Sequence, residues 1–151
     1  MSKPSSTDDN SPLSERVGFL LVKLGFCATD RLAERLAPLG LGARHFELLS
    51  YVADAEGLSQ QQLADAMGLH RNQMVKLVDG LEARKLVERR PHPADRRAHA
   101  IALTDKAREL LSEARRAADD QEAYFTAPLD GDEAREFARL LRRVADHAGL
   151  S

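Results

Sequence analysis

Apolar residues recur every three or four positions along most of the chain, a spacing that predicts helices with one buried face. The predicted helices cover 14–37, about 43–54, a short segment after Ser59, about 71–84, about 105–125 and a last segment after Asp130. Residues 1–12 are polar and acidic and lack this spacing. That segment is therefore expected to be a disordered tail.

The spacing changes between the fourth and fifth predicted helices. Residues 86–90 and 98–103 are short runs typical of strands, and the segment between them is Pro-His-Pro-Ala-Asp-Arg-Arg. Two prolines and an aspartate between two short strands favour a hairpin with a long, basic tip. The sequence therefore predicts a mainly α fold with one small β-hairpin.

The third and fourth predicted helices are spaced as a helix-turn-helix. Ser59 precedes Gln62 by three positions, which is the spacing of a capping box at a helix start. Ala64 is small enough for two helices to cross closely, and Gly68 permits the tight turn between them. Met74 would hold the fourth helix against the body, so that its N-terminal end points outward toward a DNA major groove.

Polar side chains at this outward end, together with the basic hairpin, are candidate DNA contacts. Arginine pairs with guanine, and asparagine or glutamine with adenine, whereas lysine suits phosphate. The predicted DNA-binding residues are Ser59, Gln60, His70, Arg71, Asn72, Gln73, Lys76, Arg90, Asp95, Arg96 and Arg97. A helix pair used only for packing or protein contact would have the same turn, but the adjoining basic hairpin favours DNA binding.

The charge distribution agrees with this interpretation, although the net charge of −2 alone argues weakly against it. Residues 70–108 contain ten Lys or Arg and five Asp or Glu, whereas 109–151 contain six and ten. Affinity for phosphates depends on local cationic density rather than on the average. The chain is 43% hydrophobic and 30% charged, which is typical of a globular protein, and it has no long apolar run. We expect it to be cytoplasmic and not bound to a membrane.

Across about 17–147 the chain resembles the MarR family of transcriptional regulators. The residues that carry the resemblance are LSQQQLADAMGLHRNQMVKLVDGLEARKLVERRPHPADRRAHAIALTDKARELL. The resemblance implies one MarR-like domain over 13–151, with a winged helix-turn-helix lobe in 40–104 and dimerisation helices in 13–38 and 105–148. It also implies that the Asp95 carboxylate orients Arg97 for entry into the minor groove. Arg96 is expected to meet phosphate.

Three positions depart from the family pattern. His70 stands where the fourth helix usually starts with serine or threonine. Val75 replaces a small hydroxyl residue, which favours the loss of one polar DNA contact. Lys85 replaces a glycine that is expected in a left-handed conformation, so retaining that geometry should cost about 1 kcal/mol.

The resemblance further implies a homodimeric repressor that binds a pseudo-palindromic operator and is released by a small phenolic or amphipathic anion. Long apolar stripes at both ends of the chain agree with a dimer. The effector would lie between the dimer base and the DNA-binding lobes. Its candidate contacts are Arg16, Leu20, His45, Phe46 and Leu111.

Two other functions stay open at this stage. Cys27 is the single cysteine and could make the regulator redox-responsive. Alternatively, the winged helix could be a protein-interaction module that has lost DNA binding. The sequence shows no nucleophile motif, no paired carboxylates and no phosphate loop, so an enzyme is not predicted. The five histidines are scattered, so neither a metal site nor a cofactor is expected.

Overall fold

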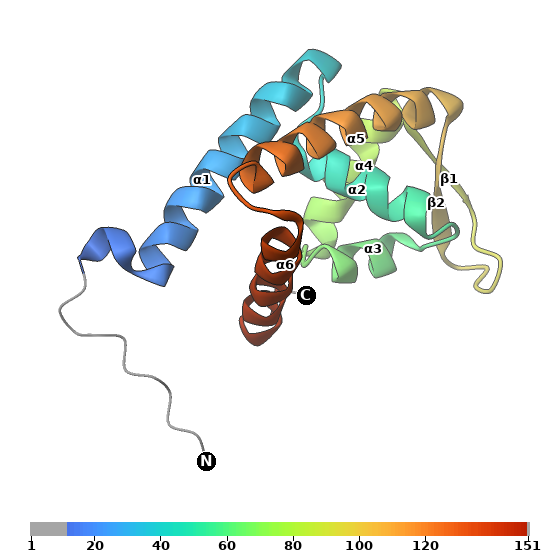
Figure 1. The fold of residues 1–151 in the computed structure, drawn as a ribbon. Coiled ribbons are helices and arrows are strands. Elements are labelled where there is room, and N and C mark those ends of the chain that lie inside the picture. The colour runs from blue at the N-terminus through green and yellow to red at the C-terminus, as the bar shows by residue number, and fades with distance from the viewer. Residues whose placement is uncertain (1–11, 151) are drawn as a thin grey trace.

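The computed structural model describes residues 12–150, so nearly all of the predicted tail at 1–12 lies outside the described residues. The elements are α1 (Val17–Leu36), α2 (Ala43–Asp54), α3 (Gln60–Ala66), α4 (Arg71–Ala83), β1 (Val87–Pro91), β2 (His99–Leu103), α5 (Asp105–Thr126) and α6 (Gly131–His147). Short 3-10 turns at Leu13–Glu15 and Ala37–Leu39 flank α1. This order, drawn in Figure 1, confirms the predicted α fold with one hairpin.

Side-chain caps start three of the helices where the sequence predicts them. The Ser59 hydroxyl accepts the Gln62 amide at 3.1 Å, and the Gln62 side chain accepts the Ser59 amide at 2.8 Å. Thr104 accepts the Ala107 amide at 3.2 Å and so starts α5. Asp130 caps α6 in the same way through two amides. These caps fix where each helix begins and hence which residues it exposes.

One buried core holds α2, α3, α4 and the hairpin together. It joins α2, α3, α4, the hairpin and the first half of α5 to the C-terminal end of α1. Gly68 has a φ of 60°, and the Leu69 amide that follows bonds the Ala64 carbonyl at 2.9 Å, which closes the turn between α3 and α4. Leu69 itself packs against the core, as the helix-turn-helix pattern predicts.

The hairpin is attached to the start of α3. β1 and β2 pair antiparallel, with Val87 opposite Leu103 and Pro91 opposite His99. On its other edge β2 bonds the segment before α3, because the Ile101 amide donates to the Leu58 carbonyl at 3.0 Å. The wing and the helix-turn-helix are therefore one hydrogen-bonded unit, and their relative position is set by backbone contacts.

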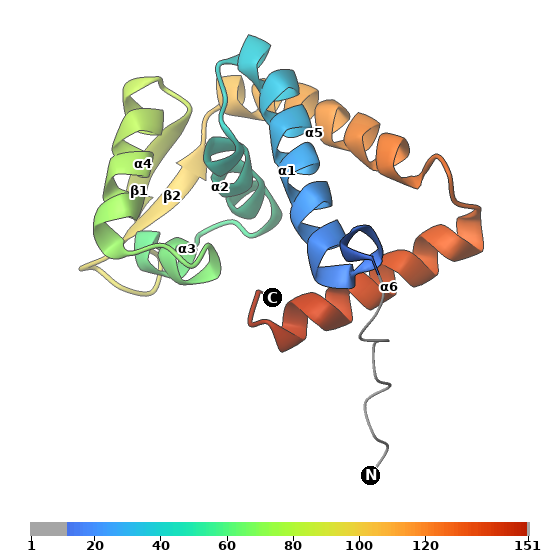
Figure 2. The same cartoon turned by 90° about the vertical axis from the view of Figure 1, so that its left-hand side faces the viewer.

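Two apolar surfaces lie outside this core. Leu36 at the end of α1 is fully buried, but Val17 and Leu24 near its beginning are 68% and 42% exposed. No residue of α6 is buried, although its apolar stripe includes Phe137 and Leu141. Figures 1 and 2 show α6 on the side of the molecule away from the hairpin. Within the single chain the N-terminal part of the α1 stripe is uncovered, and its predicted burial against a second copy stays a prediction.

Among residues 12–150, Lys85 is the one residue other than glycine that has a positive φ, which is 58°. Its amide bonds the Glu82 carbonyl at 2.9 Å, and the Leu86 amide bonds the Leu81 carbonyl at the same distance. These bonds end α4 and turn the chain into β1. The expected left-handed geometry is confirmed, and a side chain at this position is unfavourable.

Lys85→Gly is expected to stabilise the fold by about 1 kcal/mol, because glycine adopts the left-handed conformation without a Cβ clash. Urea unfolding followed by circular dichroism measures the change. Ala83→Gly is the matched control: Ala83 is exposed at the end of α4, so glycine there should destabilise by about 1 kcal/mol. A lower midpoint for Lys85→Gly would contradict the strain at this position.

Candidate nucleic-acid interface

The N-terminal end of α4 presents its polar side chains to solvent. Met74 and Val78 are fully buried and fix the helix against the core. Val75 is half-buried. The predicted contacts on the other side of α4 are all exposed: His70, Arg71, Asn72, Gln73 and Lys76. The helix therefore offers the residue types that recognise base edges and phosphates.

His70 does not replace the missing serine or threonine at the start of α4. Its side chain forms no cap bond with the helix. Instead, the Gln73 side chain accepts the His70 amide at 3.1 Å, which forms one half of a capping box. Gln73 Oε1 therefore already accepts a bond within the helix, so a bidentate contact with adenine would share or replace that bond, whereas Nε2 can donate to a base without breaking it.

The wing tip is shaped by side-chain to backbone bonds. The His92 Nδ1 atom accepts the Ala94 amide at 3.1 Å and the Asp95 amide at 3.2 Å. The Asp95 carboxylate in turn accepts the Arg97 amide at 2.9 Å. Sequence analysis gave His92 no function. Its place directly before the proline-rich tip is the signal that could have indicated this turn.

The expected contact between the Asp95 carboxylate and the Arg97 guanidinium is not formed. Among residues 12–150 the ion pairs do not include one between these two side chains. Asp95 holds the backbone of Arg97, because a carboxylate two residues earlier closes an Asx turn more readily than it reaches the next guanidinium. It positions the wing tip, and the Arg97 side chain stays exposed.

Four predicted DNA contacts from different elements meet at one surface. Ser59 and Gln60 at the start of α3, Arg71 at the start of α4 and Arg97 on the wing line the same hollow of about 320 Å³. Arg71 and Arg97 both line this hollow, beside the bonded segment that joins β2 to α3. The local geometry suits a phosphate backbone passing between α4 and the wing.

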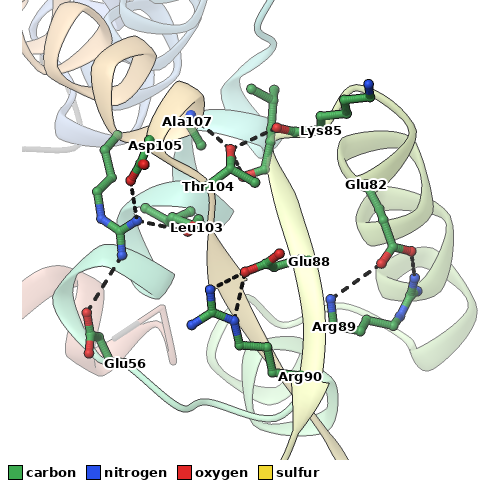
Figure 3. Close-up of polar contacts among 12 residues, drawn as sticks. Glu56, Glu82, Lys85, Glu88, Arg89, Arg90, Leu103, Thr104, Asp105 and Ala107 are labelled. Atoms are coloured by element: carbon green, nitrogen blue, oxygen red, sulfur yellow. Dashed lines mark hydrogen bonds and ion pairs between the residues drawn. The ribbon is translucent and has the colours of Figure 1, made fainter.

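Arg89 on β1 connects the wing to the recognition helix, as Figure 3 shows in part. Its guanidinium pairs with Asp79 at 2.5 Å and with Glu82, both on α4, and donates to the Gln60 side chain at 3.3 Å. The Arg89 side chain is only 23% exposed. Sequence analysis missed this residue, although two carboxylates three positions apart on α4 were a usable signal.

Arg89→Met is expected to destabilise the fold by about 1–2 kcal/mol, because both carboxylates of α4 lose their partner while remaining partly exposed. Urea unfolding measures this loss. Arg96→Met, at an exposed position on the wing, should change stability by less than about 0.5 kcal/mol. Equal stability of the two variants would show that Arg89 does not hold the wing to α4.

Arg90 lies apart from the other predicted contacts. Alternate residues of a strand point to opposite faces, so Arg90 turns away from α4 and pairs with Glu88 on its own strand (Figure 3). It lines a second hollow, between the hairpin and α5. Of the predicted DNA contacts, Arg90 is the one that the fold places on the other face of the hairpin.

The five candidate effector contacts lie on three helices. Arg16 and Leu20 are exposed at the beginning of α1, whereas Phe46 packs against the core. His45 accepts the Gly42 amide through Nδ1 at 3.0 Å, which satisfies the start of α2. Leu111 on α5 lines the hollow beside the hairpin. That these five residues form one effector site stays a prediction.

Partial burial and the nearby Arg84 lower the pKa of His45. Protonation also removes the acceptor that binds the Gly42 amide. The folded state therefore prefers neutral His45, and the free energy of unfolding should fall as pH drops below about 6.5. His45→Gln keeps an acceptor that does not titrate. Urea unfolding between about pH 7.5 and 5.5 should show a smaller decrease for this variant, and identical decreases would contradict the assignment.

Within residues 12–150, no helix is long and apolar enough to cross a lipid bilayer.

Comparison with known proteins agrees with the geometry of this interface. Residues 39–98 match the model of the MarR family. A protein from Thauera aromatica, provisionally assigned as the transcriptional regulatory protein for the hcr operon, is 31% identical over 153 residues. The alignment covers 95% of this chain and 92% of that protein. The matched family segment contains the helix-turn-helix, β1 and the tip of the hairpin, and it ends directly before β2.

Solved structures are similar over most of the chain. A MarR family transcriptional regulator from Rhodococcus sp. RHA1 is 32% identical, with a TM-score of 0.77 and coverage of 89% of this chain and 96% of that one. CouR from Rhodococcus jostii RHA1, bound to p-coumaroyl-CoA, is 32% identical with a TM-score of 0.79 and coverage of 89% and 95%. The repressor CouR bound to a 23-mer DNA duplex gives a TM-score of 0.80 at 30% identity, with coverage of 88% and 94%.

Proposed function

The chain belongs to the MarR family of transcriptional regulators, and from this premise we propose that it is a homodimeric repressor of a pseudo-palindromic operator. The observation that carries this proposal is the meeting of Arg71 and Arg97, from the recognition helix and the wing, at one hollow. A helix in the major groove and an arginine in the adjacent minor groove would then bind the same half-site.

The proposed contacts divide by chemistry. Arg71, Asn72 and Gln73 face the major groove, where Gln73 Nε2 can donate to a base while Oε1 keeps its bond to the His70 amide. Residues that suit phosphate or the groove edge are Ser59, Gln60, His70, Lys76 and Arg96. Arg97 enters the minor groove, on a wing tip that Asp95 and His92 hold in shape.

The homodimer is proposed because the chain leaves apolar faces uncovered at both ends. On α1 and α6 these faces include Val17, Leu24, Phe137, Leu140 and Leu141, each at least 37% exposed. A second copy would bury them and place two recognition helices about 34 Å apart, one turn of DNA. The distance between the two recognition helices of the dimer then determines the spacing of the half-sites that it binds.

The proposed effector is a small phenolic or amphipathic anion that lowers affinity for the operator. CouR, which is bound to p-coumaroyl-CoA in one structure and to DNA in another, supports this class because its ligand combines a phenol with anionic phosphates. The alternative of redox control would rest on Cys27, which is exposed on α1. No second feature of residues 12–150 favours it, so we propose the small-molecule response.

A mobility shift with the promoter upstream of the chain's own gene tests this function. At fixed salt we expect a specific complex that resists excess scrambled duplex, and that p-coumaroyl-CoA or p-coumarate dissociates. Equal affinity for promoter and scrambled duplex would contradict sequence-specific regulation. A specific complex that neither compound changes would contradict the proposed effector class alone.

A further inference from the structure

Gln73 is bonded to the residue before α4 through both its side chain and its backbone. Its Oε1 atom accepts the His70 amide at 3.1 Å, and its own amide donates to the His70 carbonyl at 3.0 Å. The His70 side chain forms no cap bond, so Gln73 supplies the side-chain bond at this helix start. The two bonds hold the carboxamide against the backbone with Oε1 already occupied.

The Nε2 atom of the same carboxamide is free to donate. Among residues 12–150 it takes part in no hydrogen bond, and Gln73 is exposed at the outward end of α4. An amide nitrogen carries two N–H donors and no acceptor. Gln73 therefore presents DNA with donors alone, whereas an unbonded glutamine presents a donor group and an acceptor.

The major-groove edges of the bases differ in how well they fit a group that only donates. Guanine presents two adjacent acceptors, N7 and O6, whereas adenine presents the N7 acceptor beside the N6 donor. Thymine presents one acceptor, O4, next to its methyl group. A bidentate contact with adenine needs Oε1 and Nε2 to face the base together, so Oε1 would share or leave the His70 amide. A guanine contact needs Nε2 alone and leaves the helix start intact.

Asn72 provides the contrast within the same turn of α4. Its side chain is exposed and forms no hydrogen bond in the described range 12–150, so its oxygen and its nitrogen are both available. Such a carboxamide has the donor and acceptor pair that matches adenine. Two neighbouring carboxamides therefore differ in recognition chemistry, and the difference arises from the bond between Gln73 and His70.

We propose that Gln73 is a specificity-determining residue that selects guanine in each half-site, with Nε2 donating to N7 and O6 while Oε1 keeps the His70 amide. This inference rests on the proposed repressor function, because it assigns one base of the operator. It differs from the usual pairing of glutamine with adenine. The bond inside the helix changes that pairing, because it removes the acceptor that an adenine contact requires.

Urea unfolding without DNA tests the bond on which the inference depends. Gln73→Met removes the acceptor of the His70 amide and should lower the urea midpoint by about 0.2–0.5 M. Gln73→Glu keeps an acceptor, and its negative charge lies at a helix N-terminus, so the midpoint should not fall. Equal midpoints for Gln73→Met and the unmodified chain would overturn the inference.

Base analogues in the operator test the assignment by fluorescence anisotropy at fixed salt. In 7-deazaguanine the N7 acceptor is absent and pairing with cytosine is kept, and 7-deazaadenine is the matching analogue of adenine. At one guanine position the analogue should weaken binding by the unmodified chain about fivefold for each half-site. Gln73→Glu has no amide donor and should lose this sensitivity to 7-deazaguanine. Asn72→Asp should lose sensitivity to 7-deazaadenine instead.

Gln62→Glu is the matched control, because Gln62 occupies the equivalent position of α3 and accepts the Ser59 amide. It adds the same charge and should leave sensitivity to 7-deazaguanine unchanged. Two results would overturn the inference: a Gln73→Glu chain that loses sensitivity to 7-deazaadenine, or one that keeps the sensitivity of the unmodified chain at every guanine. Equal affinity of the unmodified chain for operator and scrambled duplex would remove the repressor proposal as well, and is distinct from either result.

Discussion

Arg97→Ala is expected to weaken binding to the operator by about tenfold to a hundredfold at fixed salt. Arg97 is exposed on the wing and lines the same hollow as Arg71. A narrow minor groove concentrates negative potential and attracts arginine, so removal of this side chain loses both charge and shape recognition. Fluorescence anisotropy with a labelled operator measures the change.

Two neighbouring variants make this result specific. Arg96→Ala removes the same charge one position earlier and should weaken binding to operator and scrambled duplex alike, because a phosphate contact carries no sequence information. Asp95→Ala removes the acceptor of the Arg97 amide and should weaken operator binding less than Arg97→Ala. Equal effects of Arg97→Ala and Arg96→Ala on both duplexes would remove the argument for an arginine in the minor groove.

Leu141→Glu is expected to convert the dimer into a monomer and to lower operator affinity by about a hundredfold or more. The side chain lies on the apolar stripe of α6, which buries no residue within its own chain. A carboxylate buried without a partner in an apolar interface is strongly unfavourable. Loss of the second subunit also removes the gain in affinity that two linked half-site contacts provide.

Sedimentation velocity measures the state of assembly, and anisotropy measures operator affinity on the same samples. Arg142→Glu introduces the same side chain at the next, exposed position of α6 and should leave both quantities nearly unchanged. The circular dichroism of both variants should match that of the original chain. A Leu141→Glu protein that still sediments as a dimer would show that α6 is not part of the interface.

The start of each of three helices could be predicted because it depends on local chemistry. Ser59, Thr104 and Asp130 bond amides two or three residues later in the same chain. The left-handed turn at Lys85 was expected from the family resemblance instead, because a lysine by itself gives no local signal for a positive φ. The cap contacts involve neighbours in sequence, so no knowledge of the tertiary fold is needed to infer them.

The spacing of α1 did not show which part of its apolar stripe packs on the same chain, because the stripe has two different fates. Leu36 packs on the chain's own core, whereas Val17 and Leu24 are exposed. Hydrophobic spacing identifies a face that avoids water but does not say whether the same chain or a second copy covers it. The apolar stripe of α1 is therefore uniform in the sequence, and only the structure separates its buried part from its exposed part.

The candidate site shows the same contrast between local and distant contacts. Exposure of Arg71, Asn72 and Lys76 follows from the helical period once Met74 faces the core. The pairing of Arg89 with Asp79 does not follow from the sequence, because Arg89 and Arg90 are adjacent in β1 and are chemically identical. Only the register of the hairpin decides that Arg89 faces α4 and Arg90 faces the opposite side.

Hydroxyl-radical footprinting of the promoter is the most direct test of a dimer that uses two helix-turn-helix and wing units. We expect two protected segments related by a dyad, with centres about 10 bp apart, each flanked by minor-groove protection that disappears in Arg97→Ala. A single protected segment without symmetry, or flanking protection that Arg97→Ala leaves intact, would contradict the account.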